Sequence, residues 1–434
     1  MENREVSQLK KVFFYGIGGI GISAIARMMI EAGKVVVGQD TKDSENIAHL
    51  RELGAVVTIG QSIDAIPADT DLIVYSRAIE VLEPEFLKAI KALTTPSLVY
   101  PEMLGLVSKD MYTIAVSGSH GKTTTTGMVA HMLMGLGADP TVVIGSFLQG
   151  TQSNFIQGKS KYFVVEADEY HRAFLNLHPN IVLITNIDLD HVDYYKDLDD
   201  IKSAYKTLVE KVPQDGYVVC DPANTDVQDI IKNVVCTVVD YKEYLFERVL
   251  TIPGRHNQVD ATLAYCVGHL LGYEKEAVDT ALATFPGTWR RFEYKGKTTT
   301  GTLVYDDYAH HPTEVRASLQ AFREKFPKGE YKLHVFFQPH LFSRTKALFT
   351  EFTTCFADAD ELILLPIFRA REVDDGSISS EILAKAIQQE NIQALSFDEA
   401  KTYLKNKKET LTDKDVIITM GAGEAYEIGD EVLK

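Results

Sequence analysis

The sequence predicts an α/β protein with parallel sheets, because short apolar strands alternate with helical patterns along most of the chain. Two predicted strands lead directly into a glycine-rich loop and then a helix, at residues 11–33 and 112–135. In the last third, each predicted strand is followed by polar residues, and an open α/β sheet binds its ligands at that edge. The 434 residues are enough for two to four domains.

Composition and charge exclude several classes of function. The net charge of −17 argues against nucleic acid or an anionic membrane as a partner. The four cysteines have neither metal-ligand nor disulfide-framework spacing, and the first residues contain no apolar segment of a signal peptide. No apolar run approaches the roughly 20 residues that span a bilayer. We therefore expect a cytoplasmic protein without membrane insertion. We expect it to act on small molecules as a monomer or homodimer, although the sequence does not decide between these two states.

The first glycine loop predicts a Rossmann-like domain at residues 1–108. The strand Lys11–Tyr15 leads into GIGGIG and a helix, and the next strand ends near Asp40. This pattern places a pyrophosphate on a helix N-terminus but does not specify the nucleotide. The structural alternative is a close helix–strand crossing that requires small residues. The predicted ligand contacts are Gly16, Gly18, Gly19, Gly21, Asp40 and Ser76.

The second glycine loop predicts a nucleotide phosphate site. The strand Tyr112–Ser117 leads into Gly118–Gly121, and a helix follows from Lys122 to about Gly135. Backbone N–H groups, the helix N-terminus and a lysine together attract an anion, and a threonine hydroxyl can bind magnesium. A glycine turn that only caps a helix would not account for a lysine followed by four threonines. The predicted nucleotide-phosphate contacts are Gly118, Ser119, His120, Gly121, Lys122, Thr123 and Thr124.

Acidic and histidine side chains follow two further strands of this central region. Glu166 follows the strand Tyr162–Val165, and His191 lies shortly after the strand Ile181–Thr185. We expect them to end adjacent strands and to converge with Thr123 on Mg²⁺, with Mn²⁺ as an alternative ion. The structural alternatives are a solvated strand end for Glu166 and a surface or helix-capping role for His191.

The last third predicts another α/β domain, which begins after a linker that contains two arginines. Residues 286–293 read PGTWRRFE, and arginine suits bidentate phosphate contact, although a solvated hinge is the alternative. Polar clusters then follow predicted strands at residues 306–312, 338–345, 369–372 and 421–423. Pro312 is placed to start a helix.

The order of motifs resembles one family along almost the whole chain. These motifs are GIGGIG, SGSHGKTTTT, EADE, TNIDLDHVDYY, PGRHN, GTWRRFE, DDYAHHPTE, QPHLFSRT, ARE and GAGE. They resemble the Mur ligases of bacterial cell-wall synthesis, and the last-third block is most similar to members that add L-alanine to UDP-N-acetylmuramate. The resemblance implies a UDP-sugar domain at residues 1–108, a P-loop ATPase-type domain at 109–288, and a Rossmann-like domain at 289–434 that brings the amino acid.

The resemblance also implies a reaction and a set of roles. ATP phosphorylates the substrate carboxylate, and the amine of L-alanine attacks the resulting acyl phosphate. Asn257 is expected by the adenine, Arg291 at the phosphates, and Asp307 at the nucleotide. The implied catalytic residues are Lys122, Glu166, His191 and Arg291.

For L-alanine we expect a cation for its carboxylate and a group that receives or orients its amine. Arg344 suits the first task and a histidine of near-neutral pKa the second. The predicted amino-acid contacts are Tyr308, His310, His340 and Arg344. The alternative is that His340 and Arg344 cap the following helix. Several family members carry a carbamylated lysine in this region. Lys206 is roughly in range, but a one-residue gap would place Tyr205 there, so the resemblance does not decide whether Lys206 is modified.

Three other functions remain open at this point. A ligase that joins a whole tripeptide to the same sugar nucleotide is favoured by EADEYHRAFL. A nicotinamide oxidoreductase would explain GIGGIG but neither the second phosphate loop nor the acidic strand ends. A non-catalytic nucleotide-binding regulator would be expected to lack the lysine, the metal ligands or the hinge arginine, and this chain has candidates for all three.

Overall fold

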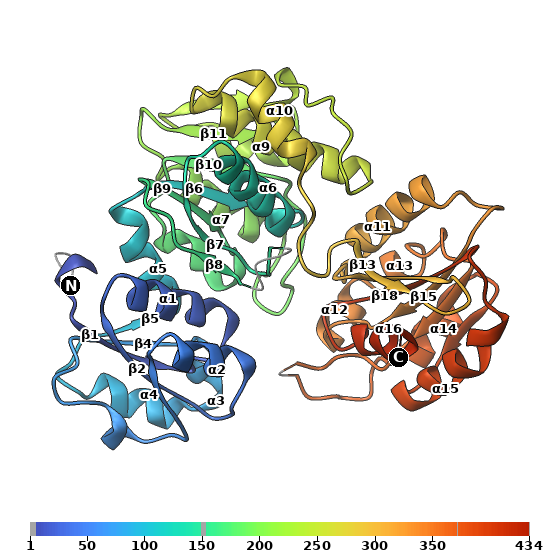
Figure 1. Ribbon diagram of the computed structural model, residues 1–434, viewed down its shortest axis with the longest axis horizontal. Helices are drawn as coiled ribbons and strands as arrows, with labels where there is room; N and C mark the ends of the chain where they lie inside the picture. Colours follow the sequence, from blue (N-terminus) through green and yellow to red (C-terminus); the bar gives the residue numbers. More distant parts are fainter. Residues whose placement is uncertain (1–5, 149–152, 371, 434) are drawn as a thin grey trace. The chain divides into compact units, whose positions relative to one another are not determined.

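The structure, a computed structural model, describes residues 6–148, 153–370 and 372–433 (Figure 1). The chain forms two compact units. The first unit comprises Met1–Ile187, Ile201–Leu245 and Thr262–Leu282, and the second comprises Asp188–Asp200, Phe246–Ala261 and Ala283–Lys434. Three mainly parallel sheets confirm the predicted α/β class. The predicted domain limits at residues 108 and 288 stay a prediction.

The first sheet has the order β3-β2-β1-β4-β5, and all its strands are parallel. Its strands are β1 (Lys11–Tyr15), β2 (Val35–Asp40), β3 (Val56–Ile59), β4 (Leu72–Tyr75) and β5 (Ser97–Val99). The helices of this part are η1 (Val6–Gln8), α1 (Ile20–Glu31), α2 (Glu45–Glu52), η2 (Ile63–Ala65), α3 (Ala78–Leu82) and α4 (Pro84–Lys91). The strand order reverses between β1 and β4, which is where an open parallel sheet binds its ligand.

Helix α5 (Tyr100–Lys109) follows β5 and was not among the elements that the sequence predicted. Pro101 lies in its first turn, where a helix has no internal acceptor for its N–H, so proline is tolerated there. Helix α5 runs almost to the next strand, β6 (Tyr112–Ser117).

The second sheet has the order β12-β11-β10-β6-β9-β7-β8, in which only β8 is antiparallel to its neighbour. Its strands are β6 (Tyr112–Ser117), β7 (Thr141–Val143), β8 (Phe155–Ile156), β9 (Tyr162–Glu166), β10 (Ile181–Ile184), β11 (Tyr217–Cys220) and β12 (Thr237–Asp240). The helices of this part of the sequence are α6 (Lys122–Gly135), η3 (Tyr170–Asn176), α7 (Leu198–Val209), α8 (Thr225–Ile231), η4 (Tyr241–Glu243), α9 (Arg255–Leu270) and α10 (Lys275–Ala283).

This order corrects the expectation that Glu166 and His191 end adjacent strands. Strand β6 lies between β9, which Glu166 ends, and β10, which precedes His191 by several residues. The apolar pattern of each strand is local, whereas the order of strands depends on packing between distant segments. The phosphate loop therefore follows β6, the strand that separates β9 from β10.

The third sheet has the order β13-β14-β18-β15-β16-β17, and only β13 is antiparallel. Its strands are β13 (Glu293–Lys297), β14 (Leu303–Asp307), β15 (Lys332–Phe337), β16 (Glu361–Leu364), β17 (Ile392–Ala394) and β18 (Asp415–Met420). The helices are α11 (Pro312–Lys325), α12 (Phe342–Ala347), α13 (Phe349–Phe352), α14 (Ser380–Ala386), α15 (Phe397–Lys407), η5 (Lys408–Thr410) and α16 (Tyr426–Leu433).

Both faces of the third sheet are buried under helices. Along β15, Leu333, Val335 and Phe337 pack into one apolar cluster with residues of α11 and α13, while Phe336 packs into another with residues of α15 and α16. Successive side chains of a strand point to opposite faces, so each central strand contributes to both clusters. Among the described residues, no helix is both long and apolar enough to cross a membrane.

A buried charged network joins three strands of this sheet to α15. The ring of His334 lies 2.6 Å from Oε2 of Glu361 and 2.8 Å from Oδ1 of Asp415. Lys407 Nζ lies 2.6 Å from both carboxylate oxygens of Glu361. Burial opposes ionisation of Glu361, but bonds to His334, Lys407 and Tyr403 outweigh it and lower its pKa to about 2.

We expect Glu361→Gln to destabilise the protein by about 3 kcal/mol near neutral pH, because breaking a buried ion network leaves its partners uncompensated. A depressed carboxyl pKa stabilises the fold above the ordinary value of 4.5, and that contribution is lost as pH falls towards about 2. Urea unfolding of both proteins across this range should show their stability difference shrinking as pH falls. A difference that stays constant with pH would contradict this.

Candidate active site

The predicted phosphate loop joins β6 to α6. The strand ends at Ser117, Gly118 has φ of 134°, and Gly121 caps the helix in a left-handed conformation with φ of 83°. Helix α6 begins at Lys122 and ends at Gly135, as the sequence predicts. The backbone N–H groups of residues 122–124 lie in its first turn, where a helix supplies no internal acceptor and an anion is favoured.

Two amides of this loop do not point at an anion, contrary to expectation. The N–H of Ser119 donates to the carbonyl oxygen of Asn186 at 3.1 Å, and the N–H of His120 donates to its Oδ1 at 2.9 Å. The Asn186 side chain also donates to the carbonyl of His120 at 3.0 Å. The segment after β10 therefore fixes the loop, and the first turn of α6 is left to supply backbone donors for phosphate.

Lys122 already has three hydrogen-bond acceptors within the protein. Its Nζ donates to the carbonyl oxygens of Gly118 at 2.6 Å and Ser119 at 3.0 Å, and lies 2.8 Å from Oε1 of Glu169. Burial opposes the charge on Lys122, but Glu169, Asp168 and Glu166 outweigh it and raise its pKa. The lysine is therefore cationic and held directly over the phosphate loop.

Two of the three predicted metal ligands lie together. The Thr123 hydroxyl donates to Oε1 of Glu166 at 2.9 Å, and Oε2 of Glu166 accepts from the N–H of Gly145 at 2.7 Å. A hydroxyl and a carboxylate beside a phosphate loop are the hard oxygen ligands that Mg²⁺ prefers. The donor set therefore fits magnesium.

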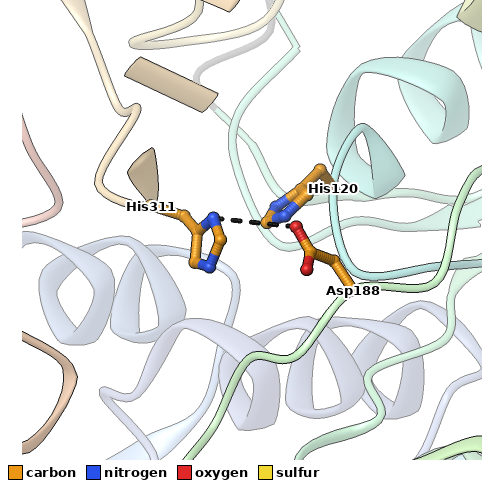
Figure 2. Close-up of side chains that lie close together, drawn as sticks. All are labelled: His120, Asp188 and His311. Atoms are coloured by element: carbon orange, nitrogen blue, oxygen red, sulfur yellow. Dashed lines mark ion pairs between the residues drawn. The ribbon is translucent and has the colours of Figure 1, made fainter. Parts of the chain in front are cut away.

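The third predicted ligand, His191, belongs to the second unit. It has φ of 51°, and the N–H groups of Tyr194 and Tyr195 donate to its carbonyl oxygen. In the same unit, Figure 2 shows Asp188 beside His311, with Nδ1 and Oδ2 4.0 Å apart. The Thr313 hydroxyl also donates to Asp188 at 3.0 Å. The convergence of His191 and Glu166 on one metal stays a prediction.

The first glycine loop brings its predicted contacts together at the ends of β1, β2 and β4. The N–H of Gly18 donates to Oδ2 of Asp40 at 2.8 Å. A Cβ at Gly16 would lie 2.9 Å from Cβ of Ser76, so a larger residue would collide with the end of β4. Gly19 is the N-cap of α1, and Gly21 lies in its first turn. The loop is thus a glycine-lined helix start at the switch point of the sheet.

The predicted clamp for a carboxylate, Arg344, is buried and already binds one. Its Nε and Nη2 donate to Oδ1 of Asp190 at 3.0 Å and 2.8 Å, and its Nη1 lies 2.9 Å from Nδ1 of His340. Asp190 is 5% exposed and Arg344 is 3% exposed. Arg344 lies within α12 and also donates to the carbonyl of His340 just before it. The N-cap residue, Leu341, makes no side-chain cap bond, and the N–H groups of Phe342 and Ser343 donate to Glu372, so neither His340 nor Arg344 caps this helix.

The pKa values of Asp190 and His340 are both lowered, with different consequences for what each side chain can do. Burial opposes ionisation of Asp190, but Arg344 and the neighbouring histidines outweigh it and hold its pKa well below the usual value. Burial, His310 and Arg344 lower the pKa of His340 to about 3. His340 is therefore neutral near pH 7 and accepts from Arg344, which suits orientation rather than uptake of a proton from an amine.

The other predicted amino-acid contacts lie beside His340. The ring centroids of His310 and His340 are 5.6 Å apart, and those of Tyr308 and His310 are 5.4 Å apart. Nδ1 of His310 lies 3.0 Å from the carbonyl oxygen of Tyr308. The Cζ atom of Arg291 lies over the Tyr308 ring, 5.1 Å from the ring centroid. The structure therefore groups Tyr308, His310, His340 and Arg344 in one unit.

The two arginines of the linker differ. Arg290 is 3% exposed and binds Asp306 and the carbonyls of Gly421 and Gly423, so it holds the third sheet together. Arg291 is partly exposed, with its Nη1 3.9 Å from Oε1 of Glu314. Of the pair, Arg291 is the one placed to reach a ligand.

Two residues expected at the nucleotide are tied to backbone groups. Asp307 accepts from the N–H groups of Phe292 and Ala309, and burial raises its pKa. Asn257 lies in the first turn of α9, and its side chain donates to the carbonyl of Pro253 at 2.5 Å. On α7, Nζ of Lys206 lies 4.0 Å from Oε1 of Glu210, which follows the helix, while the neighbouring Tyr205 is fully buried.

We expect Gly118→Ala to cost about 3 kcal/mol of stability, because its backbone angle excludes other residues and its Cβ would lie 1.9 Å from Oγ1 of Thr185. Gly137→Ala is the matched control. Gly137 has φ of 74° and open space around it, so about 1 kcal/mol is expected. Thermal unfolding measures the stability of both variants. Equal losses of stability would contradict the close approach of Gly118 to Thr185, which follows β10.

Sequence reasoning missed three residues that the site depends on: Glu169, Asn186 and Asp190. Each lies in a motif that the sequence singled out, EADE or TNIDLDHVDYY. The signal was the excess of acidic and amide residues after a strand. Their partners could not be assigned, because irregular segments do not fix the direction of a side chain.

The chain is similar to known proteins along nearly its whole length. Residues 11–112 match the Mur ligase family, catalytic domain, residues 116–267 match the Mur ligase middle domain, and residues 290–423 match the Mur ligase, glutamate ligase domain. The UDP-N-acetylmuramate–L-alanine ligase of Clostridium kluyveri is 40% identical over 98% of both chains. That of Clostridium beijerinckii is 38% identical over 98% of both chains.

Solved structures show the same fold. The UDP-N-acetylmuramate–alanine ligase of Thermotoga maritima has a TM-score of 0.76 and 27% identity, and the match covers 97% of this chain and 98% of that one. A murein peptide ligase from Psychrobacter arcticus has a TM-score of 0.72 and 22% identity, with 98% of both chains covered. At that identity the second likeness concerns the fold alone.

Proposed function

Because the chain belongs to the Mur ligase family, we propose that it is an ATP-dependent ligase that joins L-alanine to the lactoyl carboxylate of UDP-N-acetylmuramate. The observation that carries the proposal is a likeness of about 40% over nearly the full length to ligases of that name. Family membership accounts for both phosphate loops. A nicotinamide oxidoreductase would account only for the first.

We propose that each predicted region holds one substrate. Residues 1–108 hold the UDP pyrophosphate on the Gly16–Gly21 loop, residues 109–288 hold ATP on the Gly118–Thr124 segment, and residues 289–434 hold L-alanine. The glycine-lined helix starts and the cationic Lys122 support the first two assignments. The buried Arg344 cluster supports the third.

The proposed reaction forms an acyl phosphate. A carboxylate oxygen of UDP-N-acetylmuramate attacks the γ-phosphorus of ATP, and ADP leaves. The amine of L-alanine then attacks the acyl carbon, phosphate leaves, and the amine loses a proton. Because the first step joins two anions, it requires charge neutralisation and positioning more than covalent help from the protein. Lys122 supplies a charge at the loop, and Arg291 is the proposed second one.

Thr123 and Glu166 would hold magnesium, since their oxygens lie together at the start of α6. When bound, Mg²⁺ neutralises phosphate charge there. The low pKa of His340 assigns it an orienting role, so His310 is the remaining predicted candidate for contact with the reacting amine.

The proposal is tested by phosphate release from ATP in the presence of UDP-N-acetylmuramate and a panel of acceptors. We expect L-alanine to support turnover, and glycine and L-serine to do so weakly, because the site is expected to have a small apolar wall. The tripeptide L-Ala-γ-D-Glu-diaminopimelate should hardly react, since it needs more space and further anion sites. Faster turnover with the tripeptide than with L-alanine would assign the chain to the recycling ligases.

A further inference from the structure

The ion pair between Lys122 and Glu169 lies at the start of α6 and is largely enclosed. The Glu169 side chain is 0% exposed and that of Lys122 is 14% exposed. A lysine ammonium has three N–H donors. In this structure they meet the carbonyls of Gly118 and Ser119 and the carboxylate of Glu169. A nucleotide phosphate can bind Lys122 directly only if one of these acceptors gives way.

The geometry indicates which acceptor that is. Gly118 and Ser119 belong to the same tight loop as Lys122, lying four and three residues before it, so their carbonyls stay with the lysine. Glu169 comes from the separate segment after β9 and is the only anion among the three. We propose that Glu169 occupies Lys122 in the nucleotide-free protein and that a nucleotide phosphate displaces it. This rests on the proposed binding of ATP at the loop.

Hydrogen bonds of its own backbone fix the segment that carries Glu169. The N–H of Tyr170 donates to Oδ1 of Asp168 at 2.9 Å, and the N–H of Arg172 donates to the carbonyl of Glu169 at 2.8 Å. His171 and Arg172 adopt left-handed backbone angles, with φ of 50° and 55°. The backbone of its own segment therefore fixes the Glu169 carboxylate beside Lys122.

Displacement of Glu169 from Lys122 should lower the affinity of the protein for a nucleotide. Displacement leaves a buried carboxylate without its cation, and the free energy of that change is subtracted from nucleotide binding. A positioning residue that only supported the loop would have the opposite effect, because its removal would weaken binding. The sign of the change in affinity therefore distinguishes the two roles.

The test is calorimetric titration of the full chain with Mg–ADP. We expect Glu169→Gln to bind Mg–ADP about tenfold more tightly than the unaltered protein, because the competing charge is gone while the shape is kept. Asp168→Asn is the matched control. It removes a charge one residue away on an exposed side chain that does not bond to Lys122, so its affinity should change much less.

Equal or weaker binding by Glu169→Gln would overturn the inference. No binding of Mg–ADP by the unaltered protein would instead overturn the proposed ATP site. If Glu169→Gln does not fold, a crystal structure of the unaltered protein with Mg–ADP decides the matter. We expect the distance from Lys122 Nζ to the Glu169 carboxylate to exceed about 4 Å there, beyond an ion pair. An intact pair beside bound nucleotide would contradict displacement.

Discussion

Lys122→Ala is expected to lower phosphate release by about three orders of magnitude, because it removes a fixed charge from the site of phosphoryl transfer. The same change removes the ion-pair partner of the buried Glu169 carboxylate, which should cost about 3 kcal/mol of stability. A loss of turnover alone would therefore not separate catalysis from folding.

The double variant Lys122→Ala/Glu169→Gln separates the two effects. Without the carboxylate there is no uncompensated buried charge, so most of the lost stability should return, whereas turnover should stay low. Steady-state phosphate release and thermal unfolding followed by circular dichroism measure both quantities. Turnover near the unaltered rate in either variant would refute the assignment of Lys122 to ATP.

Arg344→Ala is expected to raise the KM for L-alanine by about a hundredfold, because a buried, charge-assisted bond to the substrate carboxylate would be lost. The KM values for ATP and UDP-N-acetylmuramate should change little. Arg344→Lys should also be impaired, since an ammonium does not reproduce the planar fork of a guanidinium.

A double variant that also changes Asp190 is the control for this experiment. Arg344 holds the buried Asp190, so its removal also destabilises the fold. Arg344→Ala/Asp190→Asn should recover stability without recovering the KM for L-alanine. If the KM for L-alanine is unchanged in Arg344→Ala while stability falls, then Arg344 serves only the ion pair with Asp190.

The fold was predictable wherever its signal is local. Strand β6 and helix α6 have the predicted limits, since apolar runs, glycine punctuation and helix periodicity depend on neighbouring residues only. Helix α5 was missed because its first-turn proline resembles a break. The order of β9, β6 and β10 was wrong because pairing depends on contacts between distant segments.

The sequence predicted the two cations of the site, but not the carboxylates that bind them. Lys122 and Arg344 stand out because a lysine at a helix start and an arginine after a strand suit phosphate and carboxylate. Their present partners, Glu169 and Asp190, lie in irregular segments, and no local pattern shows where such side chains point. In both cases a predicted ligand-binding cation is bound by a carboxylate of the chain itself.

The central claim is that ATP activates the lactoyl carboxylate as an acyl phosphate before L-alanine attacks. The most direct test uses UDP-N-acetylmuramate with heavy oxygen in the lactoyl carboxylate, followed by mass spectrometry of the released phosphate. We predict that one labelled oxygen passes from the carboxylate to each phosphate, and that the amide product keeps the other. Unlabelled phosphate, formed together with the same amide product, would contradict the acyl phosphate.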